Sequence, residues 1–133
     1  MNPQRFLFIA GTTLVALGSL GVLGYLQRIS HASLFRPPSW INWVHLGVGT
    51  AALAIAARGA KRLQAGVVLF PAVLGTTLGV AGLAFGGAAA RRFDMPDLAD
   101  PSDHLAHLTV GLMALWAWTG RSRDLHAAQA PSV

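Results

Sequence analysis

The chain contains no cysteine and no glutamate, and only 11% of its 133 residues are charged. The absence of cysteine excludes disulfides, thiolate metal sites, cysteine nucleophiles and the Cys-x-x-Cys-His motif of covalent haem attachment. The absence of glutamate excludes the His-Glu-x-x-His motif of zinc proteases, in which the glutamate is the general base. Soluble domains are usually about one quarter charged, and so few charges would not cover a water-exposed surface. We therefore expect lipid to surround much of this chain.

Motifs of common enzymes are also missing. The sequence has no nucleophile elbow, no Walker A loop and no dinucleotide-binding fingerprint. The net charge of +5 comes from basic residues that lie singly or in pairs, with no basic stripe and no aromatic stacking platform. We therefore predict that the protein is not an enzyme and that nucleic acid is not its partner.

What the chain does have is apolar sequence, which makes up 53% of its residues. Four apolar segments approach the 17 to 25 residues that cross a hydrocarbon core of about 30 Å. They predict an all-α polytopic membrane protein with four transmembrane helices in an up-down bundle. A tight turn at Gly59 predicts that the second and third helices are antiparallel neighbours. The segments are Phe6–Leu26, Trp40–Ala57, Leu63–Phe85 and Leu105–Trp118.

The distribution of lysine and arginine between the loops predicts how the chain is oriented in the membrane. One set of basic residues lies at the two ends of the chain and in the turn between the second and third segments, and it outnumbers the set in the other two loops. Because basic residues favour the cytoplasmic side, we expect both termini in the cytoplasm of a bacterium, and the chain as a multi-pass protein of the inner membrane. Residues 121–133 are expected to form a flexible cytoplasmic tail. The larger set is Arg5, Arg58, Lys61, Arg62, Arg121 and Arg123, and the smaller is Arg28, Arg36, Arg91 and Arg92.

A polar motif occurs twice, each time at the start of an apolar segment. Residues 42–45 read Asn-Trp-Val-His and residues 104–107 read His-Leu-Ala-His, and each copy is followed by a glycine in the same register. Upstream of each copy the string Gly-Thr-Thr-Leu also recurs, at 11–14 and 75–78. These echoes predict a single domain built from two repeated helix pairs, about 5–58 and 63–120. The positions that define the motif are Asn42, Gly49, Asp103 and Gly111.

Glycines recur at helical spacing in the first and third segments. In lipid the hydrophobic effect does not drive helices together, so their association depends on close packing. Small residues spaced in this way let the helix backbones approach closely. We expect these glycines to pack helices within one chain, and the alternative is a seam between copies in a homo-oligomer. The glycines are Gly18, Gly21 and Gly24 in the first segment and Gly75, Gly79, Gly82 and Gly86 in the third.

Histidines in the two motif copies are the candidate functional residues. His45 and His107 should lie at the same depth, on helices placed diagonally across the bundle, so that both face its interior. Asn42 and His104 lie three residues earlier and therefore on the same faces. This geometry predicts a pocket on the external side that is lined by three imidazoles and one amide.

Three interpretations of this pocket stay open. In the structural one, Asn42 or Asp103 caps its helix, and the histidines form hydrogen bonds across the bundle. In the second, His45 and His107 are axial ligands of haem or another tetrapyrrole. In the third, His45, His104 and His107, with Asp103 as a further candidate, hold a zinc or copper ion.

The motif copies also support a family resemblance. Leu34-Phe35, the stretch 42–49 with its Asn-x-x-His pattern, and an acidic loop that ends Asp103-His104-Leu105-Ala106-His107 resemble a bacterial membrane family catalogued as domain of unknown function 4383. The resemblance covers about 6–119 and implies four spans, with an acidic-residue-and-His pattern at the fourth. The chain departs from it at His104, where a residue such as asparagine would be expected. The family carries no known activity.

The composition and motifs together predict a structural or accessory component of a membrane assembly that needs no cofactor. Its expected partners are the lipid bilayer and either further copies of itself or a larger membrane complex. The first alternative is a redox or pigment module that uses His45 and His107. The second alternative is a small channel or carrier.

Overall fold

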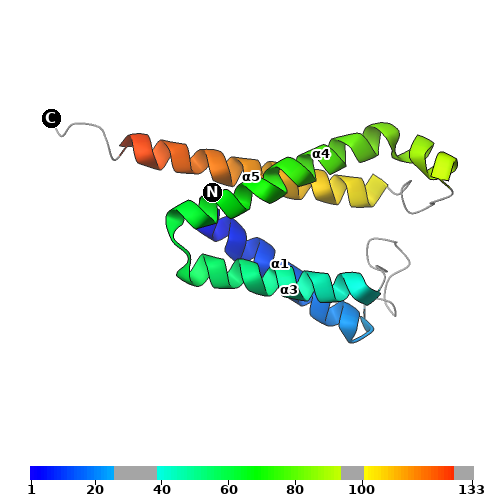
Figure 1. Cartoon of the computed structure of the whole chain (residues 1–133), viewed down its shortest axis with the longest axis horizontal. Coiled ribbons are helices and arrows are strands. Elements are labelled where there is room, and N and C mark those ends of the chain that lie inside the picture. The colour runs from blue at the N-terminus through cyan, green and yellow to red at the C-terminus, as the bar shows by residue number, and fades with distance from the viewer. Residues whose placement is uncertain (26–38, 94–100, 128–133) are drawn as a thin grey trace.

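The computed structural model describes residues 1–25, 39–93 and 101–127 (Figure 1). The described residues form four helices, which agree with the all-α fold class: α1 (Pro3–Val22), α3 (Ser39–Arg58), α4 (Lys61–Phe93) and α5 (Pro101–Ala127). The Leu34-Phe35 pair and the acidic loop before Pro101 lie outside the described residues. Helix α5 continues without a break through Arg121 to Ala127, into the segment predicted as a tail, because no glycine or proline follows Gly120 there.

Local sequence explains where α1 begins and ends. The side chain of Asn2 caps the helix by accepting a hydrogen bond of 2.9 Å from the backbone N–H of Arg5, and Pro3 occupies the first turn, where its missing N–H has no cost. The helix ends at Val22, before the predicted limit at Leu26. The reason is Gly24, which has a φ of 72°, a left-handed conformation that terminates helices and favours glycine.

The helices form two hairpins. Helix α1 packs along α3, and α4 packs along α5 (Figure 1). Helices α3 and α4 run in opposite directions from the turn at Gly59, as predicted, but they diverge from it and contact each other little beyond the turn. A short turn fixes only where two helices meet; the length of their contact is decided by which faces fit together.

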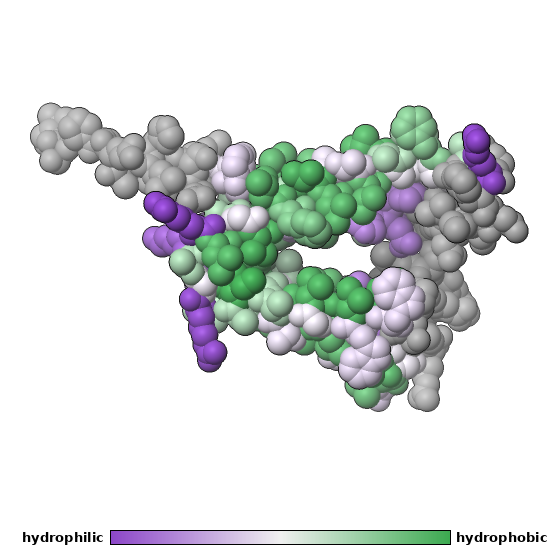
Figure 2. Space-filling view, viewed as in Figure 1, coloured by the Kyte–Doolittle hydropathy of each residue, from purple (hydrophilic) through white to green (hydrophobic). Residues whose placement is uncertain are grey.

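One apolar cluster joins the two hairpins. It brings together residues of all four helices near the start of α1 and the turn between α3 and α4. Most of its members are small, which allows the four helices to cross closely. Beyond this junction the hairpins splay apart, and Figure 2 shows an open space between them, so the four helices do not close into a bundle. The buried members are Phe6, Leu7, Ala56, Val68, Ala72, Ala114 and Ala117.

Two glutamines close the end of α3 at this junction. The amide nitrogen of Gln64, a buried residue, lies 3.1–3.2 Å from the carbonyl oxygens of Ile55, Ala56 and Gly59. Gln4 of α1 donates a further hydrogen bond of 3.0 Å to the carbonyl of Ala56. The last carbonyls of a helix have no partner within it, and here side chains from α1 and α4 supply the donors.

Apolar side chains cover large parts of the face shown in Figure 2, and many large hydrophobic residues of the described helices are exposed. Within the described residues, three helical segments are long and apolar enough to cross a membrane: Pro3–Val22, Trp40–Arg58 and Lys61–Ala88. Large side chains such as Phe8, Phe70 and Phe85 stand exposed on these segments, as expected for surfaces that face lipid. Helix α5 is not among the three, because Asp103, His104 and His107 lower the hydropathy of its first turns.

Candidate functional site

Glycines of α1 form the contact with α3 in the first hairpin. A Cβ atom built on Gly11 would lie 2.9 Å from the carbonyl oxygen of Gly49, and one built on Gly49 would lie 2.8 Å from that of Gly11. One built on Gly18 would meet the carbonyl oxygen of Asn42 at 2.7 Å, and Gly21 lies directly against the Asn42 side chain. Any side chain at these positions would push the two helices apart.

Glycines of α4 form the corresponding contact with α5. A Cβ atom on Gly75 would lie 2.7 Å from the carbonyl oxygen of His107 and 3.0 Å from the backbone nitrogen of Gly111. Gly79 faces Leu108, and Gly82 lies directly against the imidazole ring of His104. The second hairpin is therefore also held by helix backbones in close contact.

Part of the two sets of contacts occupies matching positions in the two motif copies, because Gly11 faces Gly49 as Gly75 faces Gly111. The polar side chains differ. His104 lies against Gly82, the counterpart of Gly18, whereas the Asn42 side chain lies against Gly21 and only its backbone meets Gly18. The two side chains therefore contact glycines at different positions of the repeat.

Asn42 is a packing residue and does not cap its helix. Helix α3 already begins at Ser39, so Asn42 lies inside the first turn, with only 2% of its surface exposed. Its side chain is held against Gly21, and its Oδ1 atom has no hydrogen-bond partner among the described residues. The interpretation of Asn42 as a helix cap is wrong, because the helix starts three residues before it. Asp103 does lie in the first turn of α5, where the negative charge of a carboxylate interacts favourably with the helix dipole.

His45 and His107 have different surroundings. His45 is half-buried on α3, and its Nδ1 atom is buried without a hydrogen-bond partner in the described part of the chain. His107 is exposed on α5, and its Nδ1 atom lies 2.7 Å from the carbonyl oxygen of Asp103, one turn earlier. A carbonyl accepts only, so the His107 proton must be on Nδ1 when the ring is neutral, which leaves Nε2 as the acceptor.

The predicted pocket of three imidazoles and one amide is not assembled. Asn42 and His104 are directed to glycines of their own hairpins, α1 and α4 respectively. No hydrogen bond joins His45 to His107, and among the described residues no group of three or more His, Asp or Glu side chains is placed to hold a metal ion. The two histidine helices belong to hairpins that splay apart at this end, which separates the motif copies.

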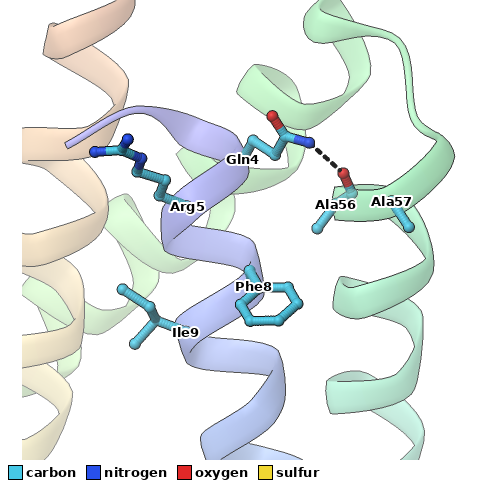
Figure 3. Close-up of a pocket in the computed structure, with 6 residues that line it drawn as sticks. All are labelled: Gln4, Arg5, Phe8, Ile9, Ala56 and Ala57. Atoms are coloured by element: carbon cyan, nitrogen blue, oxygen red, sulfur yellow. Dashed lines mark hydrogen bonds between the residues drawn. The ribbon is translucent and has the colours of Figure 1, made fainter.

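A groove opens on the outer side of the first hairpin, near the junction (Figure 3). Its volume is about 410 Å³, and it is lined by Gln4, Arg5, Phe8, Ile9, Ala56 and Ala57. A second apolar groove follows one face of α4 from Gly66 to Thr77. Sequence reasoning identified neither groove, nor the roles of Gln4 and Gln64. The available signal was a glutamine in the first turn of two of the apolar helices, Gln4 in α1 and Gln64 in α4.

Comparison of the chain with protein families, curated proteins and solved structures finds no match. The resemblance to the family catalogued as domain of unknown function 4383 therefore remains a hypothesis that rests on the motif residues alone.

Proposed function

We propose that this chain is a small structural or accessory protein of the bacterial inner membrane. It crosses the membrane four times, with both termini in the cytoplasm, and it has no catalytic activity of its own. Support for membrane placement comes from the three long apolar helices and their exposed aromatic and aliphatic side chains.

The observation that carries this proposal is that residues of the repeated polar motif contact glycines inside the two hairpins. Asn42 and His104 lie on glycines inside the two hairpins, and the carbonyls of the motif residues meet glycines as well. Polar side chains inside a membrane are most often functional, but these are placed where they fill helix contacts. Their arrangement supports a role in building the hairpins.

We place helix α5 in the membrane because it packs along α4. It is packed along α4, which is apolar enough to span, and its polar His104 is covered by the contact with Gly82. A helix whose polar residues face a neighbouring helix needs less hydropathy to insert than an isolated one. We therefore include α5 as the fourth span.

The splayed hairpins support an accessory role. The hairpins are joined at one end only, so the apolar surfaces that face the open space have no partner within the described chain. Lipid contacts alone do not favour a splayed arrangement over a closed one. Helices of a second copy or of a larger membrane complex would bury these surfaces.

Extraction of the protein from its membrane into native lipid discs, followed by mass measurement, tests this proposal. We expect a fixed assembly heavier than the 13.9 kDa chain. The assembly should be lost in Gly49→Leu, which breaks the first hairpin, and retained in Gly47→Leu, whose glycine has no neighbour within 4 Å. A single 13.9 kDa species in discs, at every lipid-to-protein ratio, would contradict an accessory role.

One observation favours the ligand alternative. With Nδ1 of His107 directed to the Asp103 carbonyl, its Nε2 atom has the orientation and tautomer that histidine ligands of haem and metals adopt. An absorption spectrum and elemental analysis of gently purified protein decide this. A visible band or bound metal that disappears in His107→Ala and His45→Ala would replace the structural proposal with a redox or pigment module.

A further inference from the structure

The groove on the first hairpin combines an apolar floor with a basic rim. Phe8 and Ile9 are 61% and 50% exposed, and the small, exposed Ala57 lines the groove on α3. In Figure 3, Gln4 reaches across to the Ala56 carbonyl near the start of α1, while Arg5 and Ile9 extend from the side of α1 that faces away from α3. An elongated apolar ligand would fit along α1 beside Ile9, with its polar end at Arg5.

Further basic residues follow the groove along the chain. Ala57, which lines the groove together with Arg5, is followed directly by Arg58, and Lys61 and Arg62 begin the next helix. All four basic side chains are exposed, and none of them forms an ion pair with a described residue. These charges therefore remain available to a ligand that carries negative charge.

We propose that this groove binds one molecule of an anionic phospholipid. One acyl chain lies along Phe8, Ile9 and Ala57, and the phosphate of the headgroup is held by Arg5 with support from Arg58. The charge complementarity selects the headgroup, because each basic residue near a membrane surface adds to the attraction for anionic lipid. The groove volume of about 410 Å³ lies within the range of roughly 300–1,000 Å³ of ligand clefts and fits part of a lipid rather than a whole one.

The position of the groove agrees with this occupant. Arg5 stands at the first turn of a membrane-spanning helix, and Phe8 and Ile9 follow one turn deeper. A phosphate at Arg5 would lie at headgroup level, and the chain would extend toward the hydrocarbon core along the helix. This inference rests on the membrane placement in the proposed function.

Native mass spectrometry of the full chain in mild detergent tests the site, with phosphatidylglycerol and phosphatidylcholine of matched acyl chains as probes. We expect one phosphatidylglycerol to be retained in preference to phosphatidylcholine. Arg5→Gln should weaken phosphatidylglycerol binding by about fivefold, the contribution of one basic residue near a membrane surface. Ala57→Phe should fill the groove and displace both lipids.

Two variants serve as matched controls. Arg92→Gln removes an exposed arginine far along α4, and Ala51→Phe adds a ring to an exposed position of α3 outside the groove. Both should bind phosphatidylglycerol as the unmodified chain does. Inorganic phosphate at millimolar concentration should not compete, because it lacks the acyl chain.

Equal retention of the two lipids would overturn the proposal, as would an equal loss in Arg5→Gln and Arg92→Gln. Competition by inorganic phosphate would show an anion site in place of a lipid site. Carbonate extraction of membranes separates this failure from that of the proposed function. A chain that stays in the membrane but shows no lipid preference loses only the lipid site, whereas a chain that is extracted loses both.

Discussion

Gly11 of α1 and Gly49 of α3 face each other reciprocally. A Cβ atom on either glycine would meet the carbonyl oxygen of the other at 2.8–2.9 Å. Real Cβ atoms do not approach backbone so closely, so neither position accepts a side chain without moving a whole helix. Gly75 and Gly111 also lie against each other's backbone in the second hairpin, although the nearest carbonyl oxygen to a Cβ atom on Gly75 is that of His107.

Alanine at Gly49 is therefore expected to destabilise the protein, although alanine is the better helix former. Overpacking against backbone should lower the free energy of unfolding by about 1–3 kcal/mol. The control is Gly47→Ala on the same helix, where the added methyl group meets nothing within 4 Å. There the gain in helix propensity, up to about 1 kcal/mol, should leave stability unchanged or raised. Denaturant titration in detergent, followed by circular dichroism, measures both; equal effects would refute the close contact.

Gly21→Ala is expected to destabilise the first hairpin through its contact with the Asn42 side chain. The atoms closest to the added methyl group all belong to Asn42, which is buried and cannot turn away. Asn42→Ala removes those atoms, so the double variant should be more stable than the sum of the single effects predicts. A coupling energy of about 0.5–3 kcal/mol is typical of residues in contact. A coupling near zero would show that the two side chains do not meet.

The second hairpin offers a related experiment at Gly82, which is the counterpart of Gly18 in the repeat. The three atoms closest to the added methyl group of Gly82→Ala are all ring atoms of His104. His104→Ala should therefore relieve Gly82→Ala, as Asn42→Ala relieves Gly21→Ala. If both cycles show coupling of the same sign, the polar side chain of each motif copy packs against a glycine of the partner helix. Coupling in one hairpin alone would argue against such a shared structural role of the two copies.

Gln64→Leu is expected to be among the more damaging single substitutions. Leucine has a similar size but cannot donate to the carbonyls of Ile55, Ala56 and Gly59, which are then left without this donor. Loss of a buried donor costs about 1–3 kcal/mol. Gln4→Leu, at an exposed residue that makes one of these bonds, should cost less. A larger effect at Gln4 than at Gln64 would contradict the role assigned to Gln64.

The membrane topology distinguishes four spans from three. If α5 crosses the membrane with α4, the C-terminus returns to the side of the N-terminus. A green fluorescent protein fused to the C-terminus should then be fluorescent, and an alkaline phosphatase fused there should be inactive, because that enzyme needs an oxidising compartment for its disulfides. The opposite pattern would mean that α5 stays outside the membrane.

Much of the architecture could be predicted from residue types. The apolar segments and the low charge identified the helices, since about twenty apolar residues with few charges are typical of a membrane-spanning helix. The glycine spacing predicted close packing. The end of α1 was misplaced because the hydropathy of Tyr25 and Leu26 continues past Gly24, whereas the backbone conformation at Gly24 stops the helix.

The candidate site was less predictable. Asn42 and His104 occupy the same position in the two motif copies, but the sequence did not determine which neighbouring helix each side chain faces. A polar side chain on a helix can face any neighbour, and the choice between a shared pocket and two separate contacts depends on which helices pair. That choice is made by the glycines of α1 and α4.

The sequence by itself determined that this protein is helical and apolar and that it carries one polar motif twice, because composition and periodicity are properties of the chain alone. Only the tertiary structure decided that the hairpins meet at one end and splay at the other. That outcome depends on contacts between distant residues, such as Gly11 with Gly49 and Gln64 with Ala56, whose geometry no local pattern encodes. It turned the doubled histidine motif from one predicted pocket into two separate helix contacts.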